Sequence, residues 1–377
     1  MANKPGLLRR IFARTILLLN ILAVLWLLLC QMASYVSPRT IKYLALFSLT
    51  SPFAIIVNLL FVFYWLFTLH KKRSLISLSV LVACFQLFSA VIGWHYFGKN
   101  DLQPGPRKLK VMTWNIHGLG IYDKPVDPTT DDKIIDFIEQ EAPDIVCLPE
   151  FYTIYSNALK PYSTTILKRC GYKEYRFKDD NSLGIKIYLG TAIFSKYPIR
   201  AFKDIPMDKY VYLLQCDVRL PDNQTLRTYF IHLQSFMLTD RDKSLIEDVK
   251  HREKDMPYTK TLNYAKRFGK AYERRAKQAD SAAGIIAQSP YPIVICGDFN
   301  DLPGSYTYQT MKGKLNDVFS EKGTGFGRTY NLFLPTLRID YIFYDPKFMK
   351  LVGYKSMRTN LSDHNPVIAN FELPQKP

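Results

Sequence analysis

Six short clusters of polar residues in the C-terminal two-thirds of this chain could together hydrolyse a phosphoester with the help of a metal ion. The clusters are Trp114-Asn115, Glu150, His232, Asp298-Phe299-Asn300, Asp340 and Asp363-His364. Most of them close a run of apolar residues, so each polar group is expected at the end of a buried strand. Acids, amides and histidines at successive strand ends predict one active site assembled from distant parts of the sequence.

Phosphoester hydrolysis sets the chemistry that these residues must supply. The reaction needs a cation that neutralises the charge building on the phosphate and a water molecule placed in line with the leaving group. It also needs a base that takes a proton from that water and hydrogen-bond donors for the phosphate oxygens. Glu150 offers the hard oxygen that Mg²⁺ or Mn²⁺ prefers. His364 can pair with a carboxylate, which would fix its tautomer and raise its basicity. Taken alone, Glu150 could be a surface acid and Asp298, after Gly297, part of a turn; the co-occurrence of all six clusters favours a site.

The pattern around the clusters predicts an α+β fold. A strand is expected from Leu109 through LKVMTWNI, then a helix over about 130–141, and a second strand that ends at Glu150. Later segments are mostly strand-like, with a polar helix over about 262–288. We therefore expect a four-layer sandwich of two packed, mainly antiparallel β-sheets flanked by helices, preceded by three transmembrane helices.

The motifs resemble those of the endonuclease/exonuclease/phosphatase superfamily, whose fold is similar to that of deoxyribonuclease I. WNI, PE, GTAIFSKYPI, HLQS, GDFN, RIDYIF and SDHNP occur in the family's order, over about Lys108 to Glu372. The sequence departs from the commoner pattern at Pro149, where Gln is frequent, and this leaves the metal ligand in place. The resemblance implies a phosphodiesterase, phosphatase or nuclease that depends on Mg²⁺ or Mn²⁺.

The resemblance also implies roles at the metal and at the catalytic histidine. Asn115 and Asp363 would join Glu150 at the metal. Asp340 would orient His364, which faces the scissile phosphate as a general acid or base or as a charge stabiliser.

Three further residues would act on the water and the phosphate. By the resemblance, Asp298 activates the water and Asn300 donates to a phosphate oxygen. His232 stands where deoxyribonuclease-I-like, sphingomyelinase-like and inositol-phosphatase-like members place a phosphate-contacting histidine, whereas abasic-site endonucleases have a different motif. Whether Asp298 or His364 takes the water's proton stays open at this point.

The N-terminal part is apolar and basic. Residues 1–110 hold 13 Lys and Arg against one acid, whereas residues 111–377 hold 37 against 32. Three apolar segments, at about 15–31, 43–69 and 75–97, approach or exceed the roughly 20 residues that cross a bilayer. We therefore divide the chain into a transmembrane region (1–100), a linker (101–107) and a catalytic domain (108–377). A cleaved signal peptide is the alternative for the first segment, but its apolar run is long and no clean cleavage site follows.

The flanking cations predict the orientation. Four cations precede the first segment, and Lys71, Lys72 and Arg73 separate the second from the third. The positive-inside rule puts both groups in the cytoplasm. Three crossings then make the chain an integral membrane protein with an extracytoplasmic catalytic domain.

The substrate is less constrained than the reaction. Anchoring beside a lipid bilayer favours a phospholipid headgroup or a small phosphodiester. An extracytoplasmic DNase or RNase is the alternative, although a net charge of +5 in the soluble part does not demand nucleic acid. A non-catalytic membrane-anchored binding module is a third possibility, against which the complete set of acids and histidines argues. The polar segment at about 236–270 is either a solvated helical insertion or a substrate lid.

Overall fold

The computed structural model of the 377-residue chain describes residues 7–105, 107–120, 127, 129–154, 162–184, 187–236, 258–331 and 336–374. Its helices are α1 (Leu7–Ala33), η1 (Lys42–Thr50), α2 (Ser51–Phe67), α3 (Lys71–Ala83), α4 (Phe85–Val91), η2 (His117–Gly120), α5 (Thr130–Glu141), α6 (Tyr162–Arg169), α8 (Tyr258–Ile286), α9 (Tyr306–Lys312) and α10 (Val318–Lys322). Its strands are β1 (Gly93–Trp94), β2 (Lys108–Thr113), β3 (Ile145–Ile154), β4 (Glu174–Gly184), β5 (Ile187–Ser195), β6 (Ile199–Asp208), β7 (Val211–Arg219), β8 (Thr225–His232), β9 (Ile293–Asp298), β10 (Asn316–Asp317), β11 (Thr324–Gly325), β12 (Asp340–Tyr344), β13 (Lys350–Ser356) and β14 (Val367–Glu372).

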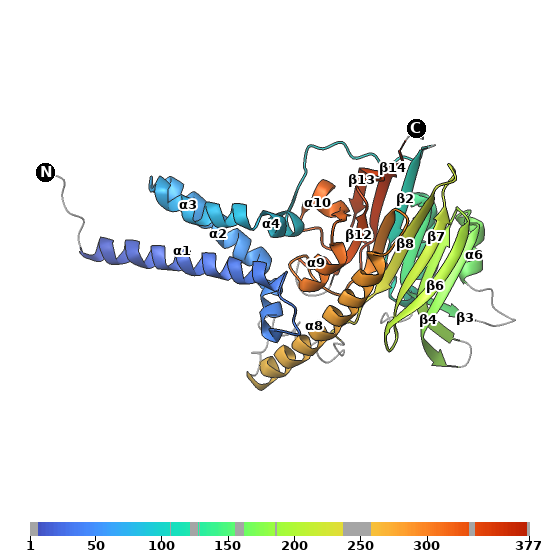
Figure 1. Ribbon diagram of the computed structural model, residues 1–377, viewed down its shortest axis with the longest axis horizontal. Helices are drawn as coiled ribbons and strands as arrows, with labels where there is room; N and C mark the ends of the chain where they lie inside the picture. Colours follow the sequence, from blue (N-terminus) through green and yellow to red (C-terminus); the bar gives the residue numbers. More distant parts are fainter. Residues whose placement is uncertain are drawn as a thin grey trace.

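Two six-stranded sheets pack face to face (Figure 1). The first has the order β10-β12-β9-β8-β7-β6 and the second the order β13-β14-β2-β3-β5-β4. Each sheet contains one parallel pair, β8 with β9 and β2 with β3, and its other neighbours are antiparallel. The predicted pair of mainly antiparallel sheets is confirmed.

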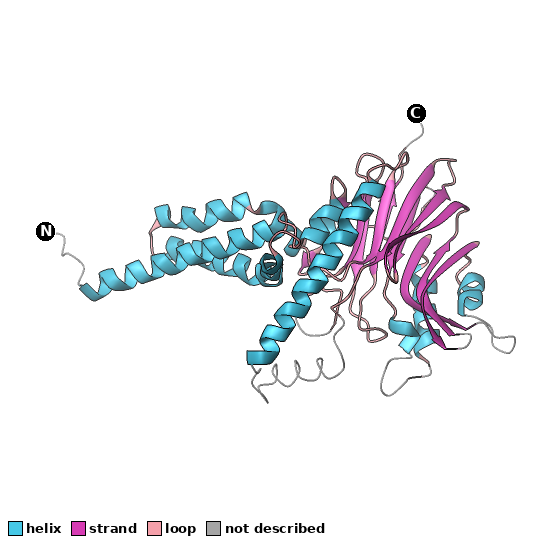
Figure 2. Ribbon diagram, turned by 60° about the horizontal axis from the view of Figure 1, so that its bottom comes forward, coloured by secondary structure: helices cyan, strands magenta, loops and turns pink. Residues whose placement is uncertain are grey.

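Side-chain alternation along the strands sets the layers. In β2, Leu109 and Val111 face the core between the sheets. Met112 points to the opposite face, where it belongs to a hydrophobic cluster that includes residues of α5. In β8, Phe230 lies in the central core and Ile231 packs with α8. Successive strand residues point to opposite faces, so each sheet buries both sides. The result is the expected four-layer sandwich, with α5 and α6 outside one sheet and α8 and α9 outside the other (Figure 2).

The N-terminal helices form an antiparallel bundle beside the sandwich. α1 runs toward the sandwich, α2 runs back and α3 returns, so the N-terminus and the α2–α3 turn share the far end of the bundle (Figure 1). Asn20 joins the three helices, because its Nδ2 donates to Ser77 Oγ at 2.5 Å and its Oδ1 accepts from Trp65 Nε1 at 2.8 Å. Ser77 in turn donates to Asn58. Each polar side chain therefore has a partner inside an apolar bundle, which helix packing in a membrane requires.

The third predicted span differs from a single helix over 75–97. The chain bends by 73° between α3 and α4, and helix ends at Val91. Two segments, Arg10–Ala33 and Lys42–Phe67, are long and apolar enough to cross a membrane, and the bent pair makes a third if it counts as one span. Beyond the bend, α4 packs beside α10 (Figure 1), with Leu87, Ala90 and Val91 buried.

The segment after α4 lies against the sandwich. β1 pairs with β11, and a Cβ atom at Gly93 would lie 2.4 Å from the carbonyl carbon of Gly323, so only glycine fits there. Asn100 and Tyr354 exchange hydrogen bonds, Asn100 donating to the Tyr354 carbonyl and accepting from the Tyr354 amide. These contacts attach the helical bundle firmly to the sandwich.

Candidate active site

Strand register brings three of the expected residues to one edge of the first sheet. His232 ends β8, Asp298 ends the parallel neighbour β9, and the two are register partners. Asp340 begins the antiparallel strand β12 and pairs with Asp298. The apolar runs that form these buried strands therefore stop at the same level, and their polar ends share one site.

The second sheet contributes Glu150 and Asn115 from its facing edge. Glu150 has a φ of 53° and lies where β3 shifts register against β5 between Leu148 and Phe151. A left-handed non-glycine residue at a bulge is costly and is often found at functional sites. Asn115 bridges the two sheets, because its Nδ2 donates to Glu150 Oε1 at 2.9 Å and to Asp298 Oδ2 at 3.1 Å.

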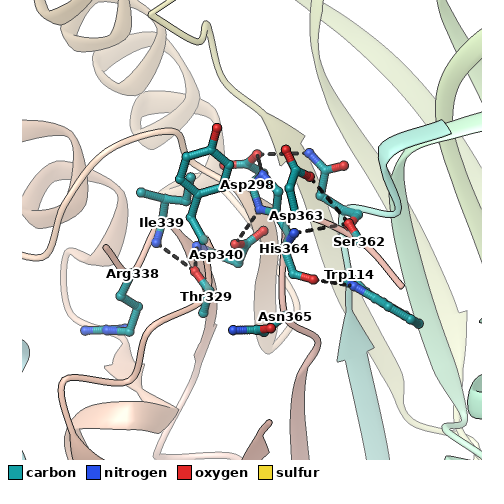
Figure 3. Close-up of polar contacts among 12 residues, drawn as sticks. Trp114, Asp298, Thr329, Arg338, Ile339, Asp340, Ser362, Asp363, His364 and Asn365 are labelled. Atoms are coloured by element: carbon teal, nitrogen blue, oxygen red, sulfur yellow. Dashed lines mark hydrogen bonds and ion pairs between the residues drawn. The ribbon is translucent and has the colours of Figure 1, made fainter. Parts of the chain in front are cut away.

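His364 and Asp340 form a buried pair. His364 Nδ1 lies 2.9 Å from Asp340 Oδ2, and Figure 3 shows the carboxylate pointing at the ring. Burial alone would lower the pKa of His364, but the charges of Asp340 and Asp298 outweigh it and raise the pKa to about 10. The two carboxylates therefore favour the protonated ring of His364, in which both nitrogens are donors.

The backbone of His364 is held by a second set of contacts. Trp114 Nε1 donates to the His364 carbonyl at 2.9 Å, and the His364 amide donates to Ser362 Oγ at 3.1 Å. Ser362 Oγ donates in turn to the Asn115 carbonyl at 2.8 Å. The loop that carries His364 is thus tied to the end of β2.

Asp298 lies between two imidazoles. Its Oδ2 atom is 3.8 Å from Nε2 of His232 and 3.8 Å from Nε2 of His364. His232 Nε2 is also 3.8 Å from Glu150 Oε1. Burial, together with the charge of Asp340, raises the pKa of Asp298 to about 6, although both histidines oppose the shift. The raised pKa makes Asp298 a stronger base than an ordinary aspartate.

Two expected residues lie at the margin of this group. Asn300 has a φ of 51°, its amide donates to Asp298 Oδ1 at 2.8 Å, and its Nδ2 donates to the Leu233 carbonyl at 2.9 Å. One donor of its side chain is therefore used on the protein. Asp363 Oδ2 is 4.0 Å from His117 Nε2, so Asp363 stands beside the site next to η2.

The donor set fits a divalent metal of the Mg²⁺ class. Asn115 holds carboxylate oxygens of Glu150 and Asp298 close together, and hard oxygens of this kind are typical ligands of that class. Among the described residues, Asp298, Asp340 and His364 also place one ligand atom each within 4.8 Å of the others. Within this second group, Asp340 Oδ2 already accepts from His364 Nδ1 at 2.9 Å.

The structure adds residues that the sequence does not single out. The ring of Tyr330 lies 4.8 Å from the His364 ring, centroid to centroid, and the two residues form an isolated β-bridge. Thr329 Oγ1 accepts from the amides of Ile339 and Asp340. Both lie in a stretch without a recognisable motif, and only the folded loop reveals their role.

The HLQS segment at the end of β8 binds Arg275 and Gln278 of α8. Arg275 Nε lies 3.2 Å from Asp301 Oδ2, and its Nη1 donates to the Gln234 carbonyl at 3.0 Å. Gln278 Oε1 accepts from the Gln234 amide. These contacts hold α8 against the end of β8. Most of the insertion predicted at about 236–270 lies outside the described residues.

Acids, an amide and two histidines at facing strand ends define a metal-dependent phosphoester hydrolase. The sequence model of the Endonuclease/Exonuclease/phosphatase family matches residues 112–364, and the chain belongs to this family. A second model, described as a domain of unknown function, matches residues 11–91. No curated protein matches the sequence.

Solved structures show the same fold at low identity. The human nocturnin catalytic domain with a bound sulfate anion is 15% identical, with a TM-score of 0.50, over 71% of this chain and 95% of that one. A family member from Bacteroides thetaiotaomicron is also 15% identical, with a TM-score of 0.50, over 72% and 100%. One from Beutenbergia cavernae DSM 12333 is 19% identical, with a TM-score of 0.49, over 71% and 72%.

Proposed function

We propose that this protein is a phosphodiesterase that cleaves a phospholipid headgroup or a small phosphodiester by in-line attack of water. The observation that carries the proposal is the placement of Asp298 Oδ2 at 3.8 Å from both His232 and His364, with Glu150 across the site. A base flanked by two imidazole side chains suits a phosphate that gains charge as it reacts.

The residues divide the reaction among them. A bound Mg²⁺ or Mn²⁺, held by Glu150 with Asn115 and Asp363, would neutralise charge on the phosphate. Asp298 accepts the proton of the attacking water, because the neighbouring carboxylates favour the protonated form of His364 and burial raises the pKa of Asp298.

The remaining side chains act on the phosphate. His364, oriented by Asp340, faces the phosphate as a donor, and His232 binds a phosphate oxygen. Asn300 supplies a further donor from its second amide hydrogen. The sulfate bound in the nocturnin structure supports the use of this fold for a tetrahedral anion.

The helical bundle supports a lipid-side substrate. The bundle packs on the sandwich through α4, and it carries two segments able to cross a membrane, or three with the bent pair. An enzyme fixed beside the bilayer meets lipid headgroups at a high effective concentration. We therefore favour them over nucleic acid.

The arrangement of the bundle supports an extracytoplasmic site. The N-terminus and the α2–α3 turn, which begins the basic run Lys71–Lys72–Arg73, share the end far from the sandwich (Figure 1). The positive-inside rule assigns that end to the cytoplasm, so the sandwich would lie across the membrane from it.

One assay series tests the function. The full chain, purified in mild detergent with Mg²⁺ or Mn²⁺, is offered phospholipids, sphingolipids, simple phosphodiesters, plasmid DNA and RNA. Turnover of lipids or small diesters that is lost in His364→Ala and Asp298→Asn, but kept in the exposed control Asp204→Asn, supports the proposal. Cleavage of nucleic acid alone would make the protein a nuclease, and no metal-dependent turnover on any substrate would make it a binding module.

A further inference from the structure

A polar cavity lies where the helical bundle meets the sandwich. Its volume is about 200 Å³, far more than the roughly 30 Å³ of one water in the liquid. The bundle contributes residues from the end of α1 and from α4, and the sandwich contributes residues from α9, β10 and α10, which face α4 in Figure 1. The active site is not part of its wall, and Figure 3 shows the side chain of Arg338, just before β12, pointing away from His364.

The cavity lies at the level where the apolar helices end. Tyr35 follows α1 directly, lines the cavity and is half-exposed. Trp94 and Tyr96 follow α4 and are also more than half exposed. Exposed Tyr and Trp at helix ends are typical of the membrane–water interface. In an inserted bundle, these aromatic residues would place phospholipid headgroups at the height of the cavity mouth.

The cavity wall carries one cation without an acidic partner among the described residues. Lys312 is half-buried, and the one hydrogen bond of its Nζ that the described residues provide is to the Leu315 carbonyl at 3.5 Å. Burial lowers the pKa of Lys312, and the charge of Asp317 offsets that shift only in part. Asp317 lies on the same wall but is paired with Arg338 at 2.8 Å. A phosphate at Lys312 would supply the missing negative charge.

The wall also carries a carboxylate bound to neutral donors. Glu321 accepts from the Tyr344 hydroxyl at 2.5 Å and from the Asn316 amide. Its negative charge disfavours a headgroup that is purely anionic, and it suits a headgroup with a cationic end. Lys312 and Glu321 together match a phosphate joined to an ammonium group.

We propose that this cavity binds the headgroup of a membrane phospholipid that carries both a phosphate and a primary amine, with the phosphate at Lys312 and the amine toward Glu321. The lipid is a structural ligand of the junction and is separate from the substrate. It fills the gap between α4 and α10 and extends its acyl chains along the bundle.

Native mass spectrometry of the full chain tests this site. Delipidated protein in detergent is mixed with phosphatidylethanolamine or with phosphatidylglycerol at equal concentrations, and the bound fraction is measured. The wild type should retain phosphatidylethanolamine in preference. Lys312→Gln should weaken retention by about tenfold or more, because a charged hydrogen bond is lost. Lys314→Gln, which removes an exposed lysine outside the cavity, should bind as the wild type does.

Two further variants keep the test decisive if Lys312→Gln is unstable. Ser89→Trp fills the cavity from α4 and should abolish retention, whereas Glu321→Gln should remove the preference for the amine-bearing lipid. Equal retention by the Lys312 and Lys314 variants would overturn the site. Equal binding of both lipids by the wild type would overturn the headgroup assignment.

Discussion

Arg338 donates from Nη2 to the carbonyl oxygen of Ala90 at 2.7 Å. This contact joins the segment just before β12, the strand that begins with Asp340, to the helical bundle. The same nitrogen lies 2.8 Å from Asp317 Oδ2, and both side chains are almost fully buried. Arg338 is two residues before Asp340, the residue that pairs with His364. The contact that holds the end of α4 therefore lies next to the contact that orients His364. Docking of the bundle and the geometry of the site are therefore linked.

Replacing Arg338 by Met should destabilise the protein by about 3–5 kcal/mol, because Asp317 is left as an unpaired buried charge. Thermal and chemical unfolding of the full chain in detergent would measure the loss. The double variant Arg338→Met/Asp317→Leu should recover part of it, and Arg358→Met, at an exposed arginine, should change little. A single variant as stable as the wild type would disprove the structural role of the pair.

Asp340→Asn should lower turnover by about 10²–10⁴-fold, with unfolding close to that of the wild type. The amide keeps the shape of the side chain but can no longer stabilise the protonated ring of His364 at 2.9 Å. The rate of hydrolysis of the best substrate is the measurement. Turnover within a few-fold of the wild type would show that Asp340 does not position this histidine.

Glu150→Gln should raise the half-saturating concentration of Mg²⁺ or Mn²⁺ by at least about 10–100-fold. Loss of a group that only hydrogen-bonds to a metal ligand already lowers metal affinity by that factor. Metal titrations of turnover in both proteins would measure the shift, and chelation should abolish wild-type turnover. Glu139→Gln, at an exposed acid paired with Arg169, is the control. An unchanged metal requirement would place the ion elsewhere.

The stability that His364 contributes should depend on pH. Its pKa is raised from the ordinary 6.5 to about 10 in the fold, so folding favours the protonated ring. This contribution is fully present below pH 6.5 and is lost as the pH rises toward 10. The difference in unfolding free energy between metal-free wild type and His364→Gln should shrink over that range. A difference that stays constant would contradict the raised pKa.

A reporter at the C-terminus should locate the catalytic domain. A fused enzyme that is active only outside the cytoplasm should give a signal, because three passes along the bundle separate the domain from the basic N-terminus. The same reporter after residue 70 should stay silent. A C-terminal fusion active only in the cytoplasm would instead make α3 and α4 a re-entrant pair.

The sequence predicts local features well, because they depend on neighbouring residues. The predicted helix over 130–141 coincides with α5, and the apolar runs before Glu150, His232 and Asp298 are strands. The fold class is therefore confirmed. The family supports the class of reaction, whereas the role of each residue stays a prediction.

Features that depend on distant contacts were not predictable. The bend at Cys84 has no proline or glycine beside it, and the α4 that follows it contacts Arg338, which is far away in the sequence. The left-handed backbone of Glu150 depends on the register of β3 against β5. The tilted ring contact of Tyr330 with His364 depends on a loop that no periodicity describes.

The short third helix has a consequence for the surrounding lipid. α3 contains 13 residues, which span about 20 Å at 1.5 Å per residue, against a hydrocarbon core of about 30 Å. α1, with 27 residues, is long enough to cross at a tilt. In an inserted bundle, α1 would therefore be long enough to cross the hydrocarbon core, whereas α3 would be too short. Acyl chains beside α3 must compress, and this mismatch would favour thinner membranes for the protein.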